Sequence, residues 1–245
     1  MNRFRSFDGL EIAWREMGHG RPTLMLHGFL ADAKRNWIQP GVAAKVAALG
    51  RRVILPDLRG HGDSAQPEAP EAWPEDALGR DQEALLAHLG VEDYDLVGYS
   101  LGARTGVRML VRGAKPGKAV LGGMGLSGLK DVIARRRHFA EAIAQSRGRV
   151  GRTVFALMAQ GGLKPEVMLR VFDSVVPTMA KDLAKITTPI LVVSGRDDEE
   201  NGSAEALAQA LPHARAERVE GDHISAVMDP SLGDAIAAWL GKPAT

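Results

Sequence analysis

A serine between two glycines, at the end of a short apolar run, constrains the fold of this chain more than any other feature. Residues 94–99 read as a buried strand, and the pattern Gly98-x-Ser100-x-Gly102 completes it. Residues 103–112 then place apolar side chains at helical spacing. Strand, G-x-S-x-G and helix together predict a sharp turn that exposes the Ser100 hydroxyl, because the glycines let the two backbones pass closely. A serine held in such a turn is a candidate nucleophile.

The balance of charges excludes several classes of partner. The 245 residues carry 31 Lys and Arg against 30 Asp and Glu, a net charge of +1 that gives no reason to expect a nucleic acid or an anionic membrane. There is no cysteine, which excludes disulfides and thiol catalysis. The N-terminal residues do not resemble a signal peptide, and no apolar run is long enough to span a membrane. We expect a cytoplasmic protein.

Strands and helices alternate along most of the chain. An antiparallel hairpin comes first, because Asp8-Gly9 between two short alternating segments is a strong turn signal. Later strand patterns end at Leu26, Leu55, Tyr99, Gly122, Ser194 and Val219. Helical patterns cover 37–49, 75–89, 103–112, 203–210 and 231–240, and 220–229 reads as a loop. This order predicts an α/β fold: a mostly parallel central sheet of about eight strands with helices on both faces.

One stretch interrupts the alternation. From Gly123 to about Lys185 the sequence has no convincing strand. Its basic amphipathic segments are Leu129–Gln145, Arg152–Gln160 and Pro165–Leu183. We interpret 126–185 as a small helical cap inserted into a core formed by 1–125 and 186–245.

A serine nucleophile requires a general base with a pKa near 7 and an acid that orients this base. In a sheet of this kind, reactive groups lie in loops at the carboxyl ends of the strands. Of the seven histidines, His223 lies in the loop after the last strand. His27 and His61 occupy glycine-bounded loops, and we interpret them as groups that hold those loops. The acid is expected among residues 197–200, Asp-Asp-Glu-Glu, which follow the preceding strand.

Five motifs together resemble the α/β-hydrolase fold superfamily over nearly the whole chain. They are Gly98-Tyr99-Ser100-Leu101-Gly102, the His27-Gly28 loop, the stretch Asp57 to Ser64, Gly195-Arg196-Asp197-Asp198 and Gly221-Asp222-His223. The resemblance implies Ser100 as nucleophile, His223 as base and, from the usual G-x-x-D spacing, Asp198 as acid. It also implies an oxyanion hole formed by the backbone N–H groups of Phe29 and Leu101.

These features predict a serine hydrolase that cleaves a small carboxylic ester or lactone through an acyl-enzyme intermediate. The cap would shape an apolar pocket, and Tyr99, Leu30 and Arg104 are expected to border the substrate. A neutral substrate leaves Arg104 with no charge to meet, so we expect its guanidinium to pair with a protein carboxylate or to reach solvent. With a dicarboxylate, Arg104 would point into the cavity instead.

Two other functions remain open. The stretch from Gly98 to Arg104 is also similar to the elbow of the menaquinone-pathway lyase that makes succinyl-cyclohexadiene carboxylate. Some proteins that share the superfamily's fold act as ligand sensors without turnover. A G-x-G-x-x-G pattern at 123–128 lacks the context of a dinucleotide site, and we expect no cofactor and no metal.

Overall fold

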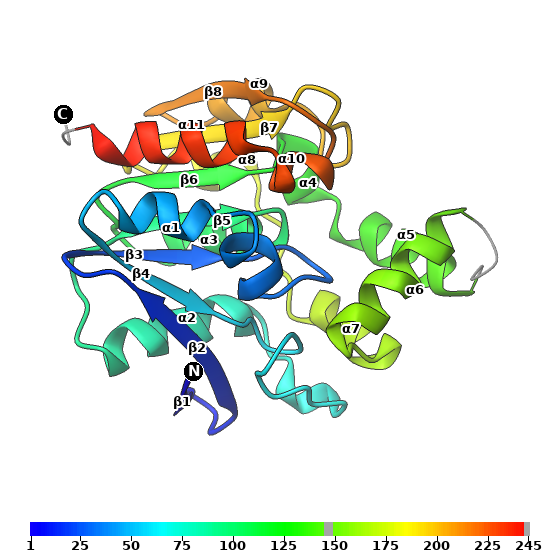
Figure 1. Ribbon diagram of the computed structural model, residues 1–245. Helices are drawn as coiled ribbons and strands as arrows, with labels where there is room; N and C mark the ends of the chain where they lie inside the picture. Colours follow the sequence, from blue (N-terminus) through cyan, green and yellow to red (C-terminus); the bar gives the residue numbers. More distant parts are fainter. Residues whose placement is uncertain (145–148, 243–245) are drawn as a thin grey trace.

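The computed structural model describes residues 1–144 and 149–242 and has an eight-stranded sheet at its centre (Figure 1). The strands lie in the order β1-β2-β4-β3-β5-β6-β7-β8. Pairing is antiparallel for β1 with β2 and for β2 with β4, and parallel for all other neighbours. The strands are β1 (Asn2–Arg5), β2 (Glu11–Met17), β3 (Arg21–Leu26), β4 (Arg51–Pro56), β5 (Asp95–Tyr99), β6 (Ala119–Gly122), β7 (Ile190–Gly195) and β8 (Ala214–Val219). The predicted fold class, a mostly parallel α/β sheet, is confirmed.

Helices cover both faces of this sheet. On one face, α1 (Val42–Ala47) packs against α11 (Pro230–Gly241). On the other face lie α2 (Ala77–His88), α3 (Leu101–Val111) and α9 (Ala204–Gln209) (Figure 1).

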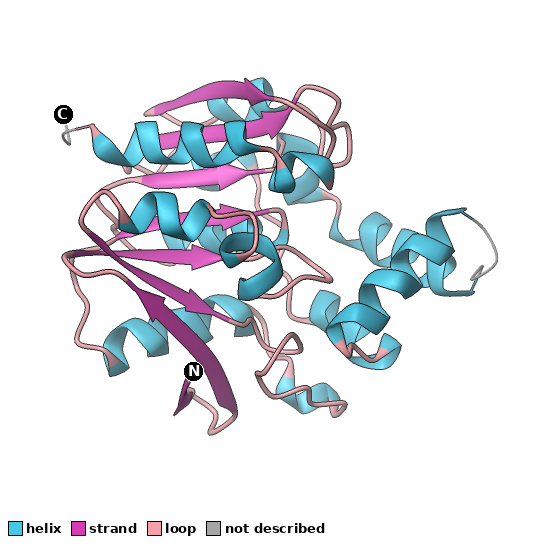
Figure 2. Cartoon of the chain, viewed as in Figure 1, coloured by secondary structure: helices cyan, strands magenta, loops and turns pink. Residues whose placement is uncertain are grey.

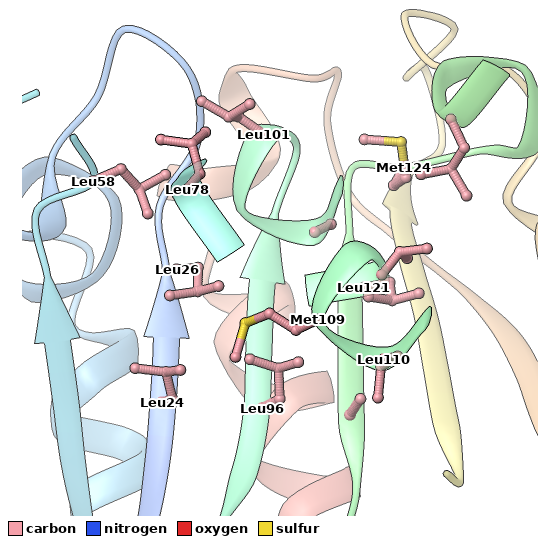
Figure 3. Packing of buried hydrophobic residues seen from close by; sticks show 14 of the residues in the cluster. Leu24, Leu26, Leu58, Leu78, Leu96, Leu101, Met109, Leu110, Leu121 and Met124 are labelled. Carbon is pink, nitrogen blue, oxygen red and sulfur yellow. The ribbon is translucent and has the colours of Figure 1, made fainter. Parts of the chain in front are cut away.

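The two faces are apolar because successive residues of a strand point in opposite directions. Leu24 of β3 and Leu96 of β5 lie in the same cluster as Met109 of α3 (Figure 3). Their neighbours Met25 and Val97 belong to the cluster beneath α1 and α11. Strands that are buried on both faces read as continuous apolar runs, which is why they could be located in the sequence.

The stretch between β6 and β7 contains only helices and loops in its described part (Figure 2). Its helices are α4 (Leu126–Lys130), α5 (Val132–Ala144), α6 (Arg149–Gly161), α7 (Pro165–Asp173) and α8 (Ala180–Leu183). Helices α5, α6 and α7 stand away from the sheet, on the side where the parallel strands end, whereas α4 contacts α9 of the core (Figure 1). Residue Gln145, the end of the first expected cap segment, lies outside the described residues.

Three segments differ from the sequence-based expectation. The helix expected over 37–49 is instead a turn of π-helix, η1 (Lys34–Ile38), followed by α1. Pro40 lacks an amide hydrogen, and Gly41 has a left-handed φ of 80°, so the helix cannot run through.

The other two differences lie later in the chain. The segment expected to be helical over 165–183 breaks between α7 and α8, where Pro177 removes a backbone donor. The loop expected over 220–229 contains a short helix, α10 (Ser225–Met228). A single 3₁₀ turn, η2 (Pro70–Ala72), completes the described elements. None of the helices in the described ranges has the length and apolar character needed to cross a membrane.

Candidate active site

The turn between β5 and α3 holds Ser100 in an unusual backbone conformation, with φ of 51° and ψ of −109°. A Cβ on Gly98 would lie 2.4 Å from the Gly102 carbonyl oxygen, and one on Gly102 would lie 2.0 Å from the Leu26 carbonyl oxygen. Only glycine fits at either position, because strand and helix backbones almost touch there. The predicted turn is therefore present, with the Ser100 hydroxyl at its apex.

A continuous hydrogen-bond chain joins three of the predicted residues. The Ser100 Oγ lies 2.9 Å from Nε2 of His223, and Nδ1 of His223 lies 2.9 Å from Oδ2 of Asp198. Asp198 follows β7 and His223 follows β8, and the parallel pairing of these strands places both loops at the same edge. The structure thus brings together Ser100, His223 and Asp198 from loops that are up to 123 positions apart in sequence.

Burial distinguishes Asp198 from its acidic neighbours. Asp198 is buried, whereas Asp197, Glu199 and Glu200 are exposed. Burial alone would raise the pKa of Asp198, but the hydrogen bond and the charge of His223 outweigh it, so the pKa of this carboxyl is lowered. Asp198 is therefore a carboxylate at neutral pH. Glu200 also comes near, since its Oε2 lies 3.9 Å from Nε2 of His223.

Tyr99 lines the second hollow described below, and its phenol also makes a contact that the sequence did not indicate. Its side chain is buried, and its hydroxyl donates a hydrogen bond of 2.8 Å to the backbone carbonyl of His223. The phenol therefore holds the loop that carries the histidine. Leu30, the next expected substrate neighbour, lines the cavity described below and has a left-handed φ of 60°.

The two expected oxyanion donors face no protein acceptor in the described part of the chain. No hydrogen bond engages the backbone N–H of Phe29 or of Leu101. The N–H of Gly28 is engaged, because it donates to Oδ1 of Asn36 at 2.7 Å. Asn36 was not singled out from the sequence: it lies in the π-helical turn, and no motif signals its contact with Gly28.

The histidines of the early loops hold the backbone around them, as expected from the sequence. His27 accepts a hydrogen bond of 2.9 Å from the N–H of Leu58 at Nε2. His61 lies 3.1 Å from the carbonyl of Arg59 through Nδ1, and burial lowers its pKa to about 3. Asp57 accepts hydrogen bonds from the N–H groups of Ala33 and Asp63, both at 3.0 Å.

Comparison with known proteins agrees with this geometry. A family model described as alpha/beta hydrolase fold matches residues 22–131. The enol-lactonase from Burkholderia xenovorans superposes with a TM-score of 0.80 at 20% identity, over 98% of this chain and 100% of that one. An esterase from a Rhodococcus species superposes with a TM-score of 0.76 at 25% identity, over 98% of each chain. The chain has the α/β-hydrolase fold.

A longer relative is known from its sequence. The dihydrolipoyllysine-residue acetyltransferase component of an acetoin cleaving system from Pseudomonas putida is 31% identical over 242 residues, which are 96% of this chain. The chain spans 56% of the length of that relative, so this match covers about half of the larger protein.

In this α/β-hydrolase fold, Ser100 and His223 lie at the wall of a cavity of about 520 Å³. The lining is mostly apolar and includes Phe139 of α5, Leu157 of α6 and Phe172 of α7. The Phe29 ring meets the rings of Phe139 and Phe172 edge-on, with centroids 4.7 and 5.0 Å away. These contacts join the helices between β6 and β7 to the loop that carries a predicted oxyanion donor.

A second hollow of about 270 Å³ is lined by the same two residues. Phe29, Ser100, His223 and Ile224 line both hollows, and Met228 adds apolar surface to the second one. Two hollows therefore meet at Ser100.

Arg104 contradicts the expectation for a neutral substrate. It neither reaches solvent nor pairs with a carboxylate in the described part of the chain; it is 4% exposed and lines the cavity. Its Nη2 donates to the backbone carbonyl of Gly128, whereas Nη1 has no hydrogen-bond partner among the described residues. The reason is position: Arg104 lies one helical turn after Ser100, so its side chain shares the side of α3 that faces the site.

The residues for a metal site are not assembled. Within 1–144 and 149–242, no three His, Asp or Glu side chains are grouped as metal ligands. The side chains assembled at Ser100 supply a hydroxyl, an imidazole and a carboxylate.

Proposed function

We propose that this chain is a serine hydrolase that cleaves a small carboxylic ester or lactone through an acyl-enzyme intermediate. The observation that carries the proposal is the hydrogen-bond chain from Asp198 through His223 to Ser100, with two distances of 2.9 Å, at the wall of an apolar cavity. The enol-lactonase and the esterase that share its fold support the same class of reaction.

Acylation follows from the positions of these groups. Ser100 Oγ attacks the carbonyl carbon while Nε2 of His223 takes the hydroxyl proton. The carbonyl oxygen becomes negative and is stabilised by the free N–H groups of Phe29 and Leu101. The carboxylate of Asp198 stabilises the imidazolium. Collapse of the intermediate breaks the carbon–oxygen bond, and the leaving alkoxide takes the proton from His223.

Deacylation repeats these steps with water as the nucleophile. His223 takes a proton from water, the resulting hydroxide attacks the acyl carbon, and Ser100 leaves with that proton. The products are a carboxylic acid and an alcohol, or a hydroxy acid from a lactone. We assign the acyl and alcohol parts of an ester to the two hollows of about 520 and 270 Å³ that Ser100 lines. Residues 126–185 act in this proposal as a cap that sets the shape of the larger hollow.

The test uses p-nitrophenyl esters of two to eight carbons and a series of γ- and δ-lactones. We expect turnover by the native chain and a loss of about 10⁴-fold in kcat for Ser100→Ala, the scale found when one member of a triad is removed. Circular dichroism checks that the variant is folded. Binding of these compounds without turnover by the native chain, or activity of Ser100→Ala within tenfold of the parent, would contradict the proposal.

A further inference from the structure

The cavity wall contains a positive charge that forms no ion pair with a carboxylate among the described residues. Three ionisable groups other than His223 and His138 line the cavity: Arg104, Arg135 and Glu200. Arg135 and Glu200 form an ion pair, with the Arg135 Nη1 3.7 Å from Oε2 of Glu200. Arg135 also donates to the backbone carbonyl of Glu200 at 2.7 Å and to the side chain of Asn201. Arg104 is left as the unpaired charge among the described residues.

The contrast with the next arginine on the same face of α3 is informative. Arg108, one turn later, donates from Nε and Nη2 to the two carboxylate oxygens of Asp76, each at 2.8 Å. Arg104 has no ion pair within the described ranges, and the segments outside them, 145–148 and 243–245, contain no Asp or Glu. Burying a guanidinium without a counter-charge is costly, so folded chains rarely leave one in this state.

The pKa of Arg104 reflects a buried charge that lacks an ion-pair partner among the described residues. Burial lowers the pKa of Arg104 to about 9, the nearby charge of Arg135 acts in the same direction, and Asp131 opposes them. The side chain is still charged at neutral pH. A carboxylate in the cavity would restore the stabilisation that the protein itself does not supply.

We propose that the substrate carries a carboxylate, and that Arg104 binds it while Ser100 attacks an ester or lactone carbonyl elsewhere in the same molecule. This inference rests on the proposed hydrolase function. Four residues of helix separate Ser100 from Arg104, an axial rise of about 6 Å. The substrate class is therefore a half-ester of a dicarboxylic acid, or a lactone with a carboxylate side chain.

The experiment compares isosteric esters that differ only in charge. Monoethyl glutarate and ethyl 5-oxohexanoate place a carboxylate or an acetyl group at the same position, and acid release is followed in a pH-stat. For the native chain we expect kcat/KM at least tenfold higher for the monoethyl glutarate anion, the scale of one charged hydrogen bond. A second pair, 4-acetoxybenzoate and 4-acetoxyacetophenone, places the charge on the leaving group. Equal rates within both pairs would overturn the inference.

Variants locate the effect. In Arg104→Met the preference for the anionic ester should fall about 10- to 100-fold, and Arg104→Lys should retain most of it because the charge remains. Arg137→Met is the control: Arg137 is an exposed arginine of α5 that does not line the cavity, so we expect the preference to change less than threefold. An equal loss for both esters in Arg104→Met would show that Arg104 only supports the Gly128 backbone.

Failure of the hydrolase proposal is separable from failure of this inference. Calorimetry with glutarate and with pentanoate requires no turnover. If no ester is cleaved but glutarate binds the native chain at least tenfold more tightly than Arg104→Met, the carboxylate site stands and the hydrolase assignment falls. If esters are cleaved and glutarate binds both chains equally, the reverse holds.

Discussion

Ser100 adopts a backbone conformation that non-glycine residues rarely occupy. Conformations of this kind cost about 1–3 kcal/mol and persist only where the surroundings enforce them. Here the Ser100 N–H donates to the Gly122 carbonyl at 2.8 Å, and its own carbonyl accepts from the N–H of Arg104 at 3.0 Å. The hydroxyl therefore meets His223 without a conformational search, which is the geometric condition for an activated serine.

At the same scale, the two adjacent aspartates give a direct test. We expect Asp198→Asn to lower kcat by several orders of magnitude, because the buried carboxylate of Asp198 bonds to Nδ1 of His223 at 2.9 Å. The exposed Asp197 has no such bond, so Asp197→Asn should change kcat less than threefold. Initial rates with one p-nitrophenyl ester suffice. If Asp197→Asn were the more damaging substitution, the acid would have to be reassigned.

At the scale of elements, the early loops depend on a contact that joins distant segments. The N–H of Gly28 donates to Asn36 in η1, whereas the next N–H, that of Phe29, has no hydrogen-bond partner among the described residues. The Phe29 ring packs edge-on against the rings of Phe139 and Phe172. One side of the predicted oxyanion hole is thus positioned by helices inserted more than 100 residues later.

Substitution of Phe139 tests this coupling. In Phe139→Ala we expect a higher KM and a lower kcat for the same ester, because loss of the 4.7 Å ring contact frees both α5 and the Phe29 loop. Limited proteolysis should cut residues 126–185 faster than in the native chain. Ile133→Ala is the control, because Ile133 lies on the same helix and is 76% exposed. Equal cleavage rates in the two variants would show that the aromatic contacts do not hold these helices.

The sequence predicted the strands, the sharp turn, Ser100 and His223, because each depends on local pattern or chain order. Among residues 197–200 it was the resemblance to the superfamily that selected Asp198. The sequence did not predict Asn36, whose role depends on a tertiary contact with Gly28 and on a helix break at Pro40. The expectation that Arg104 would pair with a carboxylate or reach solvent was wrong, because the pairing of a long side chain depends on which carboxylates the fold brings near it.

At the scale of the whole molecule, buried histidines make stability depend on pH. In the folded chain the pKa of His61 is about 3, and that of His27 is also lowered, chiefly by burial. The unfolded chain has histidines with a pKa near 6.5 and therefore binds more protons below that pH. Stability from these groups is fully present above about pH 6.5 and is lost as the pH falls toward 3.

Urea unfolding at pH 7 and pH 5 measures this dependence. As the pH falls from 7 to 5, His61 gains a proton in the unfolded chain but not in the folded one. We expect this difference alone to lower the free energy of unfolding by about 2 kcal/mol. His61→Asn retains a donor for the Arg59 carbonyl but cannot be protonated. The free energy of unfolding of this variant should therefore decrease less between pH 7 and pH 5, by about the same 2 kcal/mol. A variant as sensitive to acid as the native chain would refute the assignment.

The helices of residues 126–185 leave the sheet after β6 and return to it at β7, and these two strands are direct neighbours in the parallel sheet. Their points of departure and return are therefore close together and are fixed by the sheet itself. Ser100, Asp198 and His223 all lie outside that stretch. The stretch can thus be lengthened, shortened or replaced by that of a relative without changing the order of the strands. Changes in this stretch can therefore alter which molecules fit the cavity without moving Ser100, Asp198 or His223, provided that the ring contacts of Phe139 and Phe172 with Phe29 are kept.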